Sequence, residues 1–244
     1  MDLWLLGYPE AALKDADCAL LEARQIEHAA TLMFTLNFPI LINTYCGNYD
    51  AANERIDELV VLAEEKGAAF RRAEGVLRRG YVLTLTGNAS AVEMVTSGID
   101  LWRSAGSTIF TPEHEFMLAI AHADSGQFDA AWRCIGKAMA AMKATKETWC
   151  EAEAHRVAGE IALKSPQRDV AKAQAHFERS LTVARAQQAK SWELRAAMSL
   201  ARLLSDQGKR RAAHDLLAPT YDWFTEGFDT RDLRKAKALL AELR

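Results

Sequence analysis

A short pattern of small and apolar residues recurs about every 40 residues along this chain, and this period limits the fold more than any other feature. Each copy places three such residues at positions i, i+4 and i+7, which lie on one face of an α-helix. In five of the six copies a glycine stands five residues before the first member, where it ends the preceding helix. A long period built from helical spacings predicts stacked helix pairs, an all-α solenoid. The six copies begin at Ala12, Ala52, Val92, Ala131, Ala173 and Ala213.

We expect helices over residues 9–24, 27–45, 49–65, 68–86, 89–104, 112–125, 128–144, 147–164, 170–188, 191–206, 210–224 and 230–243. The single domain, 1–244, then divides into a partial repeat (1–26), full repeats over 27–67, 68–106, 111–145, 147–189 and 190–226, and a capping helix over 229–244. Thr111 before Pro112 is typical of a helix N-cap, and residues 165–169 form the one irregular connection. The apolar stump at residues 3–6 predicts either a fragment of a longer protein or an end that packs on a partner.

Composition excludes several classes of protein. Half of the 244 residues are hydrophobic and 26% are charged, as in a folded globular chain. The net charge of −3 provides no general attraction for nucleic acid or an anionic membrane, so we expect neither as a partner. The four cysteines fall in predicted helices without paired spacing, which indicates buried free thiols. No uninterrupted apolar span or signal peptide is recognisable, so we expect a cytoplasmic location.

Motifs for chemistry are missing from the chain. It has no phosphate-binding Gly-x-x-x-x-Gly-Lys-Ser/Thr, no Gly-x-Gly-x-x-Gly, no Gly-x-Ser-x-Gly and no His-Glu-x-x-His. The six histidines are scattered, whereas a metal site needs three or four converging ligands. We therefore predict no enzyme activity, no cofactor and no metal, and expect the tryptophans to pack between repeats. Arg71, Arg72, Arg78 and Arg79 suit either an anion site or a solvated face paired with nearby glutamates, and the second interpretation is favoured.

The repeats resemble a known family. Residues 47–52 and 126–131 both read Gly-x-Tyr/Phe-x-x-Ala, and Gly80 and Gly159 stand where the tetratricopeptide (TPR) pattern has a glycine in the first helix. Residues 149–230 also resemble the TPR-like C-terminal tail of bacterial multidomain signalling proteins, in which a nucleotide cyclase or a DNA-binding domain and an ATPase module precede the tail. This resemblance implies a regulatory or scaffolding tail whose catalytic parts lie upstream, and it assigns no catalytic residue to this chain.

In TPR-like stacks the first helix of each pair lines a concave groove, which is the predicted site for a protein or peptide partner, including upstream domains of the same chain. The alternative is that these inner-face residues merely pack and pair with one another. A second hypothesis is a metabolite sensor that uses Tyr81, Phe116, Glu153, Arg156 and Arg195, and a third is homodimerisation through residues 3–6. The predicted groove residues are Asn37, Leu77, Tyr81, Phe116, Glu153, Arg156, Glu160, Arg195, Met198 and Arg202.

Overall fold

The computed structural model describes all residues, 1–244, and consists of helices, turns and bends without a strand. The predicted all-α repeat fold is confirmed, and each predicted helix coincides with one observed helix apart from small shifts at its ends. One further helix, α1, lies in the predicted stump. The helices are α1 Asp2–Leu5, α2 Pro9–Gln25, α3 Ala29–Cys46, α4 Tyr49–Glu65, α5 Ala69–Leu85, α6 Ala91–Ser104, α7 Thr111–Asp124, α8 Phe128–Thr145, α9 Glu151–Lys164, α10 Val170–Ala186, α11 Lys190–Asp206, α12 Arg210–Asp222 and α13 Arg231–Leu243.

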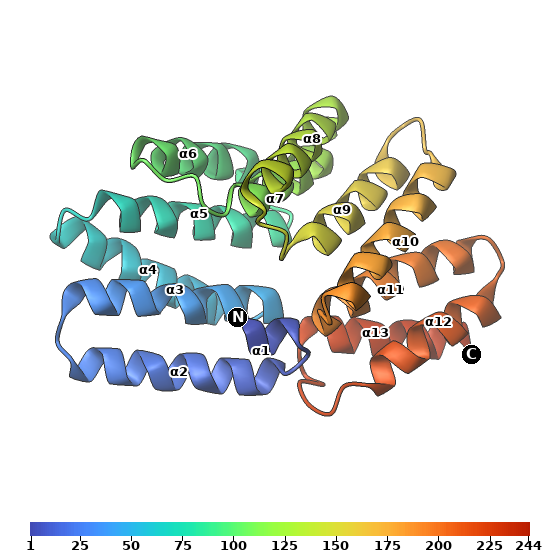
Figure 1. Cartoon of the computed structure of the whole chain (residues 1–244), viewed down its shortest axis with the longest axis horizontal. Helices are drawn as coiled ribbons and strands as arrows, with labels where there is room; N and C mark the ends of the chain where they lie inside the picture. The colour runs from blue at the N-terminus through green and yellow to red at the C-terminus, as the bar shows by residue number, and fades with distance from the viewer.

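The helices form two layers. The first helices of the pairs make the inner layer, in which α3, α5, α7, α9, α11 and α13 each contact the next. Their partners α2, α4, α6, α8, α10 and α12 cover the outside. The pairs fan around until the last helices lie beside the first ones (Figure 1). The chain is therefore a curved solenoid whose two ends meet.

Most of the small and apolar residues of the repeated pattern lie on the buried faces of the helices, as their spacing predicted. In the second repeat Ala52, Ile56 and Leu59 are completely buried. The turn before them depends on Gly47, whose φ of 88° belongs to the left-handed region that glycine adopts without a Cβ penalty. Gly159 has a different role, because a Cβ there would come within 2.4 Å of the Phe177 ring. That glycine allows α9 and α10 to approach closely.

Some local predictions were wrong. Thr111 does not cap α7, because Phe110 is the N-cap residue and the Thr111 hydroxyl donates to the Thr108 carbonyl at 2.6 Å. The Phe110 amide instead donates to the carboxylate of Glu147 at 2.7 Å. Cys18 is exposed, whereas the other three cysteines are buried free thiols as expected. Cys18 lies on a part of α2 that faces solvent in this structure.

Contacts between the two ends close the solenoid. The short helix α1 contacts α11, and the Ser191 hydroxyl donates to the carbonyl oxygen of Trp4. The Ala11 amide donates to Glu226 at 2.9 Å, and the Gly227 amide donates to Glu10 at 2.6 Å. The apolar stump, which the sequence predicted to be either a fragment end or a contact with a partner, packs through Trp4 on the C-terminal repeats of its own chain. Trp4, Ala12 and Ala16 of the N-terminal end share one hydrophobic core with Ala189 and Trp192.

One helix, α3, is long and apolar enough to cross a membrane by length and composition. Most of its residues are buried in this structure, where α2, α4 and α5 pack around it. Burial in the core accounts for its apolar sequence.

Candidate functional site

Most of the predicted groove residues lie on the inner layer but do not reach solvent. Six of the ten have at most 5% of their surface exposed. The inner helices of the N-terminal half press against one another at these positions, so the apolar part of the predicted groove is core. The six buried residues are Leu77, Tyr81, Phe116, Glu153, Arg195 and Met198.

Two of these six residues, Glu153 and Arg195, belong to a buried polar cluster where the inner helices converge. We call it the central cluster and define it as Tyr45, Arg78, Glu113, Glu153, Arg195 and Asp232. On one side, the Tyr45 hydroxyl donates to Glu113 Oε1 at 2.6 Å, and Arg78 Nη1 donates to Glu113 Oε2 at 3.2 Å. Arg78 Nε donates to Asn37 at 3.0 Å, which accounts for the predicted groove residue Asn37. These bonds connect α3, α5 and α7.

Arg195 makes the other side of the central cluster. Its Nε donates to Asp232 at 2.5 Å, its Nη1 donates to Glu153 at 3.3 Å, and its Nη2 donates to the carbonyl oxygen of Tyr45 at 3.0 Å. A guanidinium group is suited to this position because its planar donors reach several acceptors at once. One side chain of α11 thereby ties α3, α9 and α13 together, and the ends of the solenoid with them.

The surroundings of Asp232, Glu153 and Tyr45 determine the ionisation state of each side chain at neutral pH. Burial alone would raise the pKa of Asp232, but Arg195 and Arg231 outweigh it and hold that pKa below its usual value. Burial would also raise the pKa of Glu153, but the Arg156 cation outweighs this effect. The pKa of Glu153 is therefore lowered as well. Burial and the adjacent Glu113 carboxylate raise the pKa of Tyr45 well above its ordinary value. Asp232 and Glu153 therefore stay ionised at neutral pH, and the Tyr45 phenol stays a neutral donor.

Beside the central cluster there is almost no free space. The cavity next to Trp4, Tyr45 and Asp232 has a volume of about 10 Å³. A gap of this size is about the minimum that holds one water molecule, so it does not accept a metabolite. The central cluster holds the fold together, in line with the alternative that inner-face residues pair with one another.

An open cavity of about 190 Å³ lies farther along the inner layer, between α5, α7 and α9. We call it the inner pocket. Its walls combine apolar groups with charges of both signs, and two predicted groove residues, Arg156 and Glu160, line it. The lining residues are Thr84, Leu85, Ile120, Ala123, Asp124, Arg156, Val157, Glu160, Ile161 and Lys164.

Ion pairs organise the inner pocket. Arg156 donates twice to the carboxylate of Glu153, at 2.8 Å through both Nε and Nη2, and more weakly to Glu160 at 3.4 Å. Glu160 also accepts the Ser199 hydroxyl at 2.7 Å. At the mouth, Lys164 contacts Asp124 at 2.5 Å on the neighbouring α7, and half of its side-chain surface remains exposed. These last charges are available to a ligand at little desolvation cost.

Sequence reasoning missed two charged residues at the mouth of the inner pocket, Asp124 and Lys164. It also predicted a groove residue, Arg202, that does not line this pocket. Lys164 follows the predicted groove residue Glu160 by one helical turn, and Asp124 follows Phe116 by two, so extending the i+4 register along each helix would have found them. Arg202 is exposed near the end of α11 and is not among the residues that line the inner pocket. Arg78, predicted on a solvated face, is only 2% exposed because it serves the central cluster.

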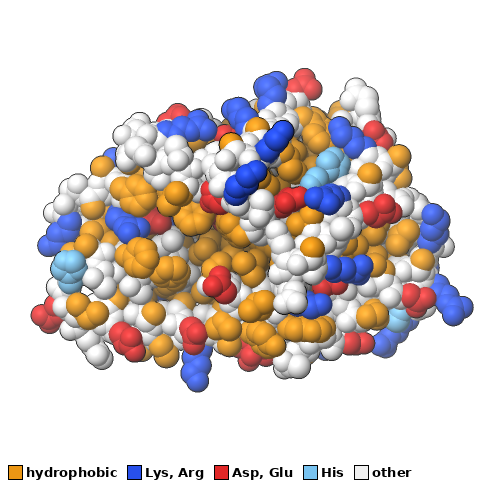
Figure 2. Space-filling model, in the orientation of Figure 1, with side chains coloured by type: hydrophobic (Ala, Val, Ile, Leu, Met, Phe, Trp, Pro, Cys, Tyr) orange, Lys and Arg blue, Asp and Glu red, His pale blue; other side chains and the backbone are white.

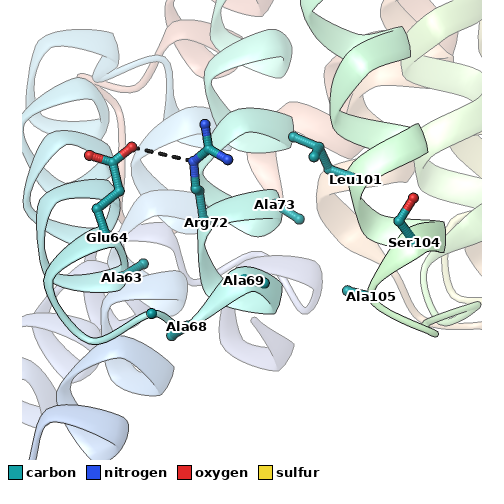
Figure 3. Close-up of a pocket in the computed structure, with 10 residues that line it drawn as sticks. Ala63, Glu64, Ala68, Ala69, Arg72, Ala73, Leu101, Ser104 and Ala105 are labelled. Carbon is teal, nitrogen blue, oxygen red and sulfur yellow. Dashed lines mark hydrogen bonds and ion pairs between the residues drawn. The ribbon is translucent and has the colours of Figure 1, made fainter.

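Three larger openings lie elsewhere on the surface, and the smallest of them, of about 300 Å³, lies between α1, α2 and α3. The one drawn in Figure 3 has a volume of about 460 Å³ and is lined mainly by alanines, with an ion pair of 3.3 Å between Arg72 and Glu64 at its edge. The largest, of about 580 Å³, lies between α1, the α8–α9 connection and the α10–α11 turn. Figure 2 shows hydrophobic side chains around a hollow in the middle of one face, over the region where α1, α3, α5 and α7 meet in Figure 1.

Histidines and cysteines do not gather into a metal centre. No group of three or more His, Cys, Asp or Glu side chains is placed to hold an ion. The closest arrangement is a pair, in which the Nδ1 atoms of His155 and His176 lie 3.1 Å apart between α9 and α10. Burial and the neighbouring His176 lower the pKa of His155 to about 4. This pair is neutral at pH 7.

Comparison with known proteins identifies the architecture only. No family model matches the chain, and no curated protein matches it. Among solved structures, the crystal structure of BtubC (BKLC) from P. vanneervenii is similar, with a TM-score of 0.59 over 87% of this chain and 89% of that chain. The two sequences are 15% identical, so the similarity extends to the helical fold and no further.

Proposed function

We propose that this chain is a non-enzymatic interaction module that holds a segment of another protein, or of an upstream part of its own protein, in the inner pocket. The observation that supports this proposal is that the inner pocket is open and lies between α5, α7 and α9 of the inner layer, the layer that lines the binding groove in TPR-like stacks. Its apolar floor and its charges of both signs suit a peptide that inserts one apolar side chain between charged neighbours. A cavity of about 190 Å³ accepts a side chain of this kind.

A metabolite sensor is supported less well. Pockets for small molecules usually have volumes of about 300–1,000 Å³, larger than the inner pocket. The residues proposed for metabolite binding, among them Tyr81, Phe116 and Arg195, are buried and contact other parts of the chain. A regulatory tail of a cytoplasmic bacterial signalling protein remains our proposal for the wider role, and it rests on the sequence resemblance alone.

The proposal is tested by charge reversal at the mouth of the inner pocket. Lys164→Glu changes an exposed cation of the pocket, and Arg168→Glu is its matched control. Each cation forms one exposed ion pair, Lys164 with Asp124 and Arg168 with Asp206, but Arg168 lies in the connection that follows α9. Neither change disturbs the central cluster, whereas reversing Arg195 would also unfold the solenoid.

We expect proteins that the wild-type chain retains in a pull-down from cells to be lost with Lys164→Glu and kept with Arg168→Glu. A photo-crosslinking amino acid at Ile120, on the wall of the inner pocket, should capture the same proteins. Equal retention by both variants, together with no crosslink at Ile120, would reject the inner pocket as the binding site. Circular dichroism and melting curves confirm that both variants are folded.

A further inference from the structure

The side chain of Trp4 occupies a site of its own inside the closed solenoid. Its ring stacks on Tyr45 with centroids 4.8 Å apart and an interplanar angle of 26°, and it meets the edge of Trp192 at 4.7 Å and 78°. The Arg195 guanidinium lies over the same ring, 5.1 Å from its centroid. Tyr45, Trp192 and Arg195 surround the ring, and the Ser191 hydroxyl donates to the Trp4 carbonyl oxygen, so that Trp4 is only 3% exposed. We call Tyr45, Ser191, Trp192 and Arg195 the Trp4 site.

The walls of the Trp4 site are held in place without help from α1. The Tyr45 hydroxyl is bonded to Glu113, and the Trp192 indole N–H donates to the carbonyl oxygen of Trp149 at 3.2 Å. Arg195 is fixed by its bonds to Asp232, Glu153 and the Tyr45 carbonyl. A site whose walls are positioned by the rest of the fold stays formed when its occupant leaves, and it binds without a large ordering cost.

The occupant, by contrast, is held at few points. Helix α1 has four residues, far below the about 12–15 residues that an isolated helix needs in water. Leu3 and Leu5 are partly buried, Leu6 is 40% exposed, and Gly7 forms the turn into α2 with a φ of 94°. Trp4 is the only fully buried side chain of α1 and therefore its anchor.

Unfilled space lies on both sides of α1. Leu5 and Leu6 border the opening of about 580 Å³, and Leu3 borders a second opening of about 300 Å³ that reaches Phe38 and Ile42 of α3. Helix α1 thus fills the middle of a wider apolar depression, and a longer helix would cover more of it.

We propose that the Trp4 site is a peptide-binding site that α1 occupies in cis, and that it also accepts a short helix of a partner protein with a tryptophan flanked by leucines. Residues 2–6 of this chain, Asp-Leu-Trp-Leu-Leu, define the chemistry of that partner segment. The indole stacks between aromatic rings under a guanidinium group, and the leucines enter the openings on either side. Lys146 and Glu147 both line the opening beside Asp2, so the site sets no preference for the charge of the residue before the tryptophan. This surface is separate from the inner pocket, and the inference holds or fails independently of the proposed function.

The covalent link makes α1 a competitor of the partner. A segment tethered by a short turn acts at an effective concentration on the order of millimolar, so a free helix with the same contacts binds weakly until α1 is displaced. A partner that fills the flanking openings as well gains contacts that α1 lacks. Binding at the Trp4 site is thereby restricted to partners that bind better than α1.

The test uses the full chain and a labelled synthetic peptide with the sequence of residues 1–8, followed by fluorescence anisotropy. Trp4→Ala removes the internal anchor and leaves the walls intact. Trp132→Ala is the matched control, because Trp132 lies on the outer helix α8 and contacts His176 and Lys172 instead. We expect the peptide to bind the Trp4→Ala chain at least about tenfold more tightly than the wild-type or Trp132→Ala chain. A peptide with alanine in place of its tryptophan should bind none of them.

Equal peptide affinity for the wild-type and Trp4→Ala chains, or no binding to a Trp4→Ala chain that melts cooperatively, would overturn the inference. If Trp4→Ala fails to fold, the wild-type chain decides the question by hydrogen exchange. Excess unlabelled peptide should accelerate amide exchange in residues 2–8, because α1 is displaced, and leave exchange in α6 unchanged. Unchanged exchange in residues 2–8 at millimolar peptide would also overturn it.

Discussion

Replacement of Arg195 by methionine tests whether the central cluster holds the ends of the solenoid together. The change keeps most of the apolar stem but removes the cation that Asp232, Glu153 and the Tyr45 carbonyl share. Both carboxylates are deeply buried, with at most 13% of their side-chain surface exposed. Removing one partner of a buried ion pair costs about 3–5 kcal/mol, because the remaining charge is left without compensation.

The expected cost lies at the lower end of this range. Each carboxylate keeps a second cation, since Glu153 still binds Arg156 at 2.8 Å and Asp232 still contacts Arg231 at 3.3 Å. We therefore expect Arg195→Met to lower the free energy of unfolding by about 3 kcal/mol. For a chain of this size, that loss corresponds to a fall in the melting temperature of about 6–12 °C.

Urea titration monitored by circular dichroism measures the change, with Arg211→Met as the control. Arg211 is 96% exposed and contacts its acidic neighbour at 3.8 Å, so its replacement should change the free energy by less than about 0.5 kcal/mol. Hydrogen exchange should show earlier opening of α1 and α13 in Arg195→Met than in the wild-type chain. A loss below about 1 kcal/mol, or unchanged exchange at both ends, would refute the assigned role of Arg195.

Three further predictions concern packing, pH and thiol reactivity. Gly159→Ala should destabilise the chain by about 1–3 kcal/mol in the same denaturation assay, because its new Cβ would lie 2.4 Å from a buried aromatic ring. The control is Gly136→Ala, whose Cβ meets nothing within 4 Å. It should be neutral or stabilising by up to about 1 kcal/mol. The pKa of His155 is about 4 and that of His176 is also lowered in the folded chain, so the unfolded chain binds more protons below its histidine pKa of about 6.5. Stability should therefore fall as the pH decreases from about 6.5 to 4, and a double replacement of this pair by glutamine should flatten that part of the curve. A maleimide reagent should add once to the native chain, at Cys18, because the other three cysteines are buried; native mass spectrometry counts the adducts, and rapid multiple labelling would contradict the packing.

The repeat architecture was predictable because it depends on neighbours in sequence. The spacing of Ala52, Ile56 and Leu59 predicted one buried helical face, and Gly47 predicted the turn before it. These features involve residues within one or two helical turns, where sequence distance and spatial distance agree. The same reasoning located Arg156 on the inner layer, where it lines the inner pocket.

The accessibility of the inner face was not predictable in this way. Tyr81 and Phe116 stood at groove positions by register, yet both are completely buried. Arg78 belonged by local pattern to a solvated face, but it meets Glu113, which is 35 residues away in sequence. Trp4 belonged to an unpaired stump, and its hydrogen-bond partner Ser191 is 187 residues away. Contacts between residues this far apart in the sequence produce no periodic pattern from which they could be predicted.

The sequence by itself determined the helices, their pairing and the period of the stack, since these follow from side-chain spacing and turn residues within each repeat. Only the tertiary structure decided that the stack closes, that the central cluster fills its interior, and that the inner pocket and the Trp4 site are separate places. The reason is geometric. A small rotation between successive repeats accumulates along a solenoid, and the sum over the whole chain sets whether its ends meet.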